Sequence, residues 1–444
     1  MTYIMMRTRL LFAILVVSLV FVSCDQESKT VIDNEEVVNG NDDNGNGDND
    51  SEPIDTSIVI TEGSVVEHDF TRGEVCPLEV YLTDQEKSLL ESGQAFAIEL
   101  FKRDAQINST HNTCISPLSI QVLLGLLNNG LKSDIANKMQ EIMFGPDATV
   151  EAINTGFSKL SESLEATNCV LLSNAIWFKK GIALNNDFLN TGLNVYHATV
   201  KNLDFGNPQV AMDSICQWAY DNSYGLLKNL GIEVRGNTIM VLGNLVWFAS
   251  AWKTPFDTRS TKPGKFTLAD GSKKEVDMMQ QMGIMSYSVL DKYKVLSLPF
   301  ENNSFRMDFY VPSNGYTVDS IIPEIDWSAG PKGGGRVSLQ MPKFTIDYSA
   351  DVRNLLENLG MSELFNVGVF DRMTNWDNDA HLTQFKQDTK IKVEEGGVEA
   401  VAASTASYEV RASYYNFNID RPFVYAIRDN ATGSFLFMGR VNDL

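Results

Sequence analysis

Apolar and polar positions follow two different periods along this chain, a helical one in the first part and a strand-like one later. Helices are predicted over about residues 83–103, 116–130, 131–143, 150–165, 186–197, 209–224 and 350–359. Strands are predicted over 170–178, 238–249, 286–300, 305–311, 337–346, 390–394, 423–428 and 435–441. Helices come first and strands dominate afterwards, so the pattern predicts a mixed α+β chain.

The first two helices carry their own start signals. Thr83 is placed to cap the first, and Ser116 caps the second with Pro117 in its first turn. Gly130 then ends the second helix. Near the C-terminus, residues 429–433 read as a hairpin-type loop between the last two strands.

An apolar run near the N-terminus is typical of an export signal. Leu10–Val22 follows Arg7 and Arg9, and its 13 residues are too few to span a bilayer as a helix. The residues before Cys24 resemble a bacterial lipoprotein signal, although Phe21 departs from the more usual leucine. We therefore predict that residues 1–23 are removed and that Cys24 is lipidated, which anchors the protein to the bacterial outer membrane, on its periplasmic or its cell-surface side. The alternative is plain secretion, with Cys24 incidental.

The next segment is acidic and poor in apolar residues. Residues 25–56 carry 11 acidic groups against the single base Lys29. Such a composition cannot build a core, so residues 24–75 are predicted to be a disordered tether. The whole chain has a formal charge of −21, which argues against nucleic acid as a partner. No Pro/Gly/Ser-rich break follows, and we predict one domain over residues 76–444.

The cysteines and histidines of the sequence form no motif that indicates catalysis or metal binding. Four cysteines of the domain could form two disulfides in an oxidising compartment or stay as buried thiols: Cys76, Cys114, Cys169 and Cys216. No Cys/His cluster suggests a metal. The chain also lacks a nucleophile elbow, an H-E-x-x-H motif and a phosphate-binding glycine loop. We predict a protein that is not an enzyme and uses no cofactor or metal.

One segment near the C-terminus has the pattern of a strand without a partner. After Gly396 and Gly397, small uncharged side chains occupy alternate positions: Val398, Ala400, Ala402, Ser404 and Ala406. The other face carries Glu399, Thr405, Ser407 and Glu409, with Val401 and Ala403 as apolar exceptions. The segment then reaches Arg411-Ala412-Ser413, a sequence that a trypsin-like protease cleaves. On composition alone it could equally be an ordinary exposed loop.

Five separated segments, in order, resemble the serpins, the serine protease inhibitor family. They are Asn112–Ser119, Asn244–Trp252, Met341–Phe344, Asp420–Phe423 and Phe437–Val441. The resemblance extends from about residue 80 to Leu444. It implies three β-sheets with eight or nine helices and an exposed reactive loop over about residues 395–420. It also implies a monomer in a metastable native state whose partners are serine proteases.

The resemblance implies suicide inhibition: a protease cleaves the loop, becomes esterified to it and is trapped when the loop inserts as a strand into the main sheet. Counting 17 residues from the hinge glutamate Glu395 reaches Arg411, so the bait bond is predicted at Arg411–Ala412. Tyr408 and Val410 are the alternatives, for chymotrypsin-like and elastase-like enzymes. The hinge comprises Glu395, Gly396, Gly397, Val398, Ala400 and Ala402, and no proline or buried charge would block its insertion.

Six further residues match positions that govern opening of the sheet. Lys343 is expected to pair with Glu395 close to Trp252, and Ser116, Ser119 and Asn244 match a polar cluster behind the sheet. Gln387 stands where a histidine is common in the family, so opening through a protonated histidine is not expected. Two other functions stay open: a non-inhibitory serpin that acts as a surface binding protein, and a ligand-binding lipoprotein.

Overall fold

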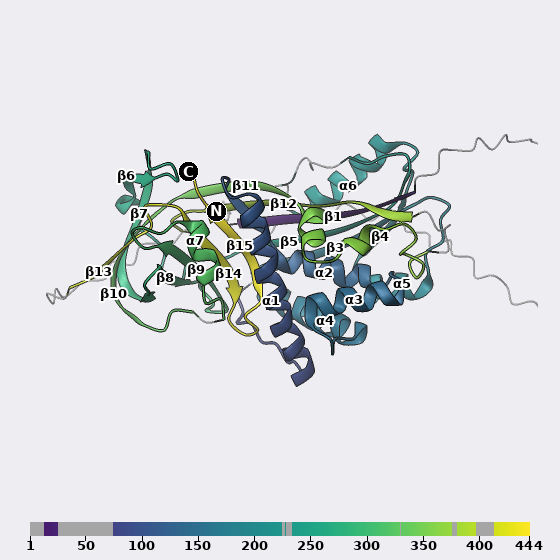
Figure 1. Cartoon of the computed structure of the whole chain (residues 1–444), viewed down its shortest axis with the longest axis horizontal. Coiled ribbons are helices and arrows are strands. Elements are labelled where there is room, and N and C mark those ends of the chain that lie inside the picture. Colours follow the sequence, from purple (N-terminus) through teal and green to yellow (C-terminus); the bar gives the residue numbers. More distant parts are fainter. Residues whose placement is uncertain are drawn as a thin grey trace, which may run out of the picture.

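A six-stranded sheet forms one half of this computed structural model (Figure 1). The structure describes residues 13–24, 74–223, 227, 233–328, 330–374, 380–396 and 413–444, and in the first of these ranges Leu19 is the one side chain described. The strand order is β11-β12-β1-β5-β3-β4. The strands are β11 (Phe344–Asp351), β12 (Ala380–Val393), β1 (Ala13–Cys24), β5 (Thr238–Ala249), β3 (Val170–Lys179) and β4 (Thr199–Leu203).

The other nine strands are connected through hydrogen bonds and make up two smaller sheets. Their order is β13-β10-β7-β8-β9-β14-β15-β2, with β6 paired to β7. The long strand β7 pairs with β10 along most of its length and with β8 only at its end, so it joins the two sheets. The strands are β2 (Thr113–Ile115), β6 (Lys262–Thr267), β7 (Lys273–Val289), β8 (Tyr293–Pro299), β9 (Phe305–Pro312), β10 (Gly334–Pro342), β13 (Tyr415–Asn418), β14 (Phe423–Asp429) and β15 (Phe435–Val441).

Eight α-helices lie among the described residues. They are α1 (Asp84–Ile107), α2 (Pro117–Asn128), α3 (Ser133–Phe144), α4 (Val150–Ala166), α5 (Asn186–Asn194), α6 (Pro208–Asn222), α7 (Val318–Ile321) and α8 (Val352–Asn358). Helices α2 to α5 lie on one side of the six-stranded sheet and α6 on the other (Figure 1). The mixed α+β architecture with three sheets is confirmed. Thr83 and Ser116 cap α1 and α2 as predicted.

Two predicted strands are wrong in extent, because each spans a break in the ladder. The run 286–300 divides into the end of β7 and β8, joined by a turn. The run 337–346 divides at Lys343, whose backbone amide donates to the Asp277 carbonyl at 2.9 Å. At that point the chain leaves one sheet as β10 and enters the other as β11. Strand β12 is much longer than the predicted 390–394. Its first ten residues mix polar and apolar side chains, so they lack the apolar run that predicts a buried strand.

The apolar run near the N-terminus is a central strand in this structure. Ala13–Cys24 forms β1, which is antiparallel to both of its neighbours, β12 and β5. The described Leu19 is 1% exposed. The sequence pointed to an export signal over these residues, and the structure adds that the same residues fit the middle of the main sheet.

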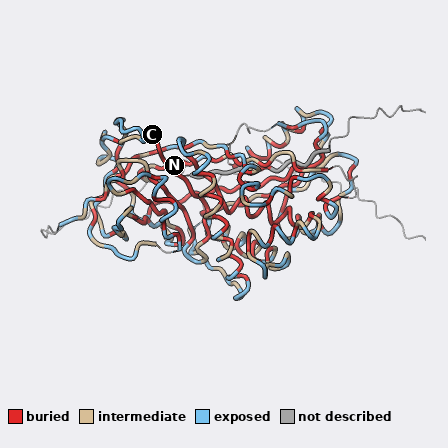
Figure 2. The backbone as a smooth tube through the Cα atoms, viewed as in Figure 1, coloured by how far each residue is buried: buried red, intermediate tan, exposed pale blue. Residues whose placement is uncertain are grey.

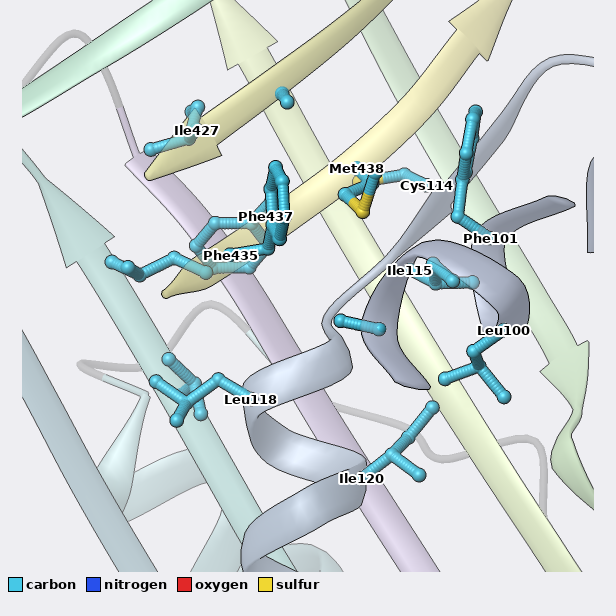
Figure 3. Close-up of a cluster of buried hydrophobic side chains, with 14 of the residues drawn as sticks. Leu100, Phe101, Cys114, Ile115, Leu118, Ile120, Ile427, Phe435, Phe437 and Met438 are labelled. Carbon is cyan, nitrogen blue, oxygen red and sulfur yellow. The ribbon is translucent and has the colours of Figure 1, made fainter. Parts of the chain in front are cut away.

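The buried residues, red in Figure 2, form a large cluster between the sheets and most of the helices and a smaller one between the six-stranded sheet and α6. Figure 3 shows part of the large cluster, where Leu118 of α2 lies on the side of Phe435 and Phe437 of β15, and Ile120 lies on the side of Leu100 of α1. All the residues of β5 are buried, and Phe248 packs against Phe300 with ring centroids 5.1 Å apart. This packing holds α2 behind the six-stranded sheet, where the candidate site lies.

A buried carboxyl group joins α1 to β11. The Tyr348 hydroxyl donates to Asp104 Oδ1, and Asn108 Nδ2 donates to the same oxygen at 3.1 Å. Burial raises the pKa of Asp104 to about 6 against these hydrogen bonds. The folded state therefore holds this proton more tightly than the unfolded chain, whose aspartate pKa is about 3.9.

Stability should accordingly fall as pH rises from about 4 to 6, by roughly 2–3 kcal/mol from this group. Asp104→Asn should remove that part of the pH dependence, because the amide has no proton to lose in this range. Urea unfolding at several pH values measures it, with Asp134→Asn on the exposed surface of α3 as the matched control. An unchanged pH slope in Asp104→Asn would contradict the assignment.

Candidate functional site

The position between β5 and β12 accepts one strand that is antiparallel to both. In this structure β1 holds that position, with Ile14–Cys24 in register with β12 and Ala13–Ser23 in register with β5. Neighbouring strands lie about 4.8 Å apart, so β5 and β12 are separated by roughly twice that distance here. Strand β12 leads directly into the segment predicted as the reactive loop.

The first turn of α2 is tied to β12 behind this position. The Ser116 amide donates to Gln387 Oε1 at 2.8 Å, and Gln387 Nε2 donates to the Ser116 carbonyl at 3.1 Å. Both residues are fully buried. The glutamine side chain thus binds both backbone groups of Ser116, the N–H and the C=O. It does so without a titratable group.

The same helical turn is tied to β5 by a second hydrogen-bond chain. Ser119 Oγ donates to Asn244 Oδ1, and Asn244 Nδ2 donates to Asn174 Oδ1 on β3 at 2.8 Å. Asn174 Nδ2 continues the chain to the Tyr196 carbonyl at 2.7 Å. The start of α2 therefore bonds to both edges of the strand position, through Ser116 on one side and Ser119 on the other.

The end of this position nearest the loop is closed by an aromatic group. Trp252 follows β5 and stacks on Phe300 with ring centroids 4.8 Å apart and planes 8° apart. Its Nε1 donates to the Glu394 carbonyl at 3.0 Å. The Phe256 amide donates to the Glu395 carbonyl at 2.8 Å. The backbone that leaves β12 is therefore held against the segment that follows β5.

Glu395 is also held through its side chain. Lys343 Nζ lies 3.0 Å from Glu395 Oε2, and Thr261 Oγ1 donates to Glu395 Oε1 at 2.7 Å. Burial alone would raise the pKa of Glu395, but these hydrogen bonds and the lysine charge hold it below its usual range. The carboxylate is thus ionised at neutral pH and fixes the point where the loop begins.

The described chain stops at Gly396 and continues at Ser413, which leads into β13 beside β10. The predicted bait bond Arg411–Ala412 lies outside the described residues, as do Gly397, Val398, Ala400 and Ala402. The structure brings together the other predicted residues in two groups. One surrounds Ser116, Ser119, Asn244 and Gln387, and the other surrounds Glu395, Lys343 and Trp252.

Two residues of the site were missed from the sequence. Asn174 is a buried amide within an otherwise largely apolar strand, and that mismatch was the signal that could have identified it. Thr261 lies in a polar turn before β6 and carries no such signal. Its role depends on the approach of Glu395, which is distant in sequence.

The described part of the chain contains no disulfide, no candidate metal site and no helix that is long and apolar enough to span a membrane. Cys76, Cys114 and Cys216 are free thiols. Any disulfide among the four cysteines would need at least one of these three, so neither of the two possible disulfides is present in the described residues. No group of three His, Cys, Asp or Glu side chains in the described ranges is arranged to hold a metal ion. The helices found there are all too short or too polar to cross a bilayer.

A family model described as Serpin (serine protease inhibitor) matches residues 91–444, most of the chain. The chain belongs to the serpin family. Serpins are protease inhibitors, which confirms the prediction that this serpin is not an enzyme.

Relatives from distant organisms resemble this serpin over nearly their whole length. Human glia-derived nexin is 30% identical, over 80% of this chain and 93% of its own. Pig plasminogen activator inhibitor 1 is 27% identical, over 78% of this chain and 90% of its own. A crystal structure of native protease nexin-1 with heparin is 26% identical with a TM-score of 0.69, and covers 81% of this chain and 100% of that one. The family match thus covers the C-terminal four-fifths of this chain.

Proposed function

We propose that this serpin is a suicide inhibitor of trypsin-like serine proteases. The observation that carries the proposal is the strand position between β5 and β12, which is antiparallel to both neighbours and lies beside the start of the loop. A strand that follows β12 through a turn has this same direction. A loop freed by cleavage can therefore enter the sheet without a change in topology.

The loop has the length and chemistry for this insertion. Glu395 to Arg411 comprises 17 residues. As a strand they span roughly 53 Å, enough to carry an attached protease along the sheet. Ladder hydrogen bonds of about 1 kcal/mol each, a dozen or more in number, favour the inserted state. The uninserted state is then held kinetically.

Arg411 is the proposed specificity residue, because a trypsin-like enzyme pairs a basic side chain with an acidic pocket. Tyr408 and Val410 are the alternative bait residues, for chymotrypsin-like and elastase-like targets. We further propose that the mature protein begins at Cys24, is lipidated there and is tethered to a bacterial membrane. The apolar run and the cysteine that follows it support this proposal.

The test mixes residues 76–444, which include the whole family match, with a small deficit of trypsin. Denaturing gel electrophoresis of boiled, reduced samples should show a band at the summed mass, formed by the ester between the catalytic serine and Arg411. Arg411→Ala should lose that band with trypsin. Cleavage without any such band, also with chymotrypsin and elastase, would leave a non-inhibitory serpin.

A further inference from the structure

We propose that the N-terminal strand β1 competes with the reactive loop for the position between β5 and β12. While Ala13–Cys24 is part of the chain, it keeps the serpin in a form that proteases cleave but that cannot trap them. The inference rests on the proposed inhibitory function and adds a control to it.

The first observation is the geometry of the pairing. β1 is in register with β12 from Ile14 to Cys24 and with β5 from Ala13 to Ser23, with one irregularity on each side. It thus spans nearly all of β5, which is Thr238–Ala249. Each neighbour has one hydrogen-bonding edge at this position, so a second strand cannot pair there at the same time.

The second observation is the match between the register and the chemistry. Ser18 is the only polar residue in Leu10–Val22. Its register partners are Asn244 on β5 and Gln387 on β12, the two amides that bond to the start of α2. The one hydroxyl-bearing residue of the run therefore lies in register with both of these buried amides. A slip of one residue would remove this match.

The packing around Leu19 gives a third, independent argument. Leu19 is buried in a cluster with Trp177 and Trp218, on the α6 side of the sheet. Its register partner on β5 is Gly243, where an added Cβ would lie 3.2 Å from Leu19 Cδ2 and 2.7 Å from Trp177 Cζ3. The absence of a side chain at residue 243 thus leaves room for Trp177 of β3 and for Leu19 together.

The competition favours β1 over the loop. The run Leu10–Val22 is rich in valine, leucine and isoleucine, whereas the loop offers mainly alanine and serine at its inward positions. β-Branched and large apolar residues form better buried strands than alanine and serine do. Both segments belong to the same chain as the sheet, so β1 also competes at a high effective concentration. The predicted removal of residues 1–23, by hydrolysis of the Ser23–Cys24 peptide bond with water, would take away almost the whole strand.

The test compares full-length chains with residues 76–444 by titration against trypsin. Every full-length chain carries Lys29→Gln and Arg72→Gln, so that trypsin does not separate β1 from the domain. We expect residues 76–444 to inhibit trypsin at a molar ratio near one. The full-length chain should be cleaved at the loop and need at least about tenfold more molecules per enzyme inhibited.

Leu19→Asp in the full-length chain should restore inhibition, because a carboxylate does not fit the apolar cluster around residue 19. Ile32→Asp, which adds the same charge outside β1, is the matched control and should behave like the parent chain. Equal inhibition by the full-length chain and residues 76–444 would overturn the proposal.

A second measurement separates this inference from the proposed function. Amide hydrogen exchange of β5 and β12 should be slower in the full-length chain than in its Leu19→Asp variant, whether or not either protein traps trypsin. If residues 76–444 fail to trap any protease, the proposed function fails, and the exchange data alone decide the inference. Equal exchange in both full-length proteins would show that β1 does not occupy the position.

Discussion

Ala400→Asp in residues 76–444 is expected to turn the inhibitor into a substrate without adding a trypsin cleavage site. Ala400 lies at an alternate position of the loop that faces the interior once the loop is inserted between β5 and β12, where β5 is buried throughout. An unpaired aspartate there costs several kcal/mol, and each 1.4 kcal/mol slows insertion about tenfold. Hydrolysis of the ester then precedes trapping. The number of inhibitor molecules consumed per trypsin should rise from about one to more than ten.

Val401→Asp is the matched control for this prediction. Residue 401 is next to Ala400 in the loop but falls on the opposite face of the inserted strand, where Glu399 already carries a charge. Its stoichiometry should remain within about twofold of the parent. If both variants lose inhibition equally, the inserted face has been assigned wrongly. If neither does, the loop is not inserted beyond residue 399.

The second large effect is expected at the bait bond. Arg411→Glu should lower the second-order rate constant for trypsin inhibition by a factor of about 1000 or more. It removes the charge that pairs with the acidic specificity pocket and replaces it with one that is repelled, a change worth about 4 kcal/mol or more. Progress curves with a chromogenic trypsin substrate measure this rate.

Val410→Ala provides the comparison, since residue 410 does not enter the pocket when Arg411 is the bait. Its rate with trypsin should stay within a few fold of the parent. The assignment of Arg411 would be wrong if Arg411→Glu inhibits trypsin normally. If Val410→Ala or Tyr408→Ala abolishes inhibition of elastase or chymotrypsin instead, the bait lies at one of those residues.

Much of the fold could be predicted because strong local signals coincide with tertiary structure. Strand β5 has the predicted ends, since an apolar run with Asn244 as its main polar interruption can only be a buried strand in this context. The start of α2 was equally clear, because Ser116 and Pro117 are a cap and a first-turn residue at once. The local sequence and the final packing agree at these places.

Other parts of the fold and the site depend on contacts between residues far apart in the chain, and they could not be predicted from the sequence. The length of β12 was underestimated because its polar positions are satisfied by partners elsewhere, such as Ser116 for Gln387. Thr261 could not be identified, since its bond to Glu395 joins residues far apart in the chain. The position of β1 in the main sheet was also not predicted, because an apolar run is compatible with an export signal and with a buried strand.

The central claim is that the cleaved loop becomes a strand between β5 and β12, and heat unfolding tests it most directly. Residues 76–444 should be cut in the loop with a protease that they do not trap, and the melting temperatures of the intact and cut forms compared. With a dozen new ladder hydrogen bonds, the account predicts a rise on the order of 20 °C. An unchanged or lower melting temperature after complete cleavage would contradict insertion, and with it the proposed inhibitory mechanism.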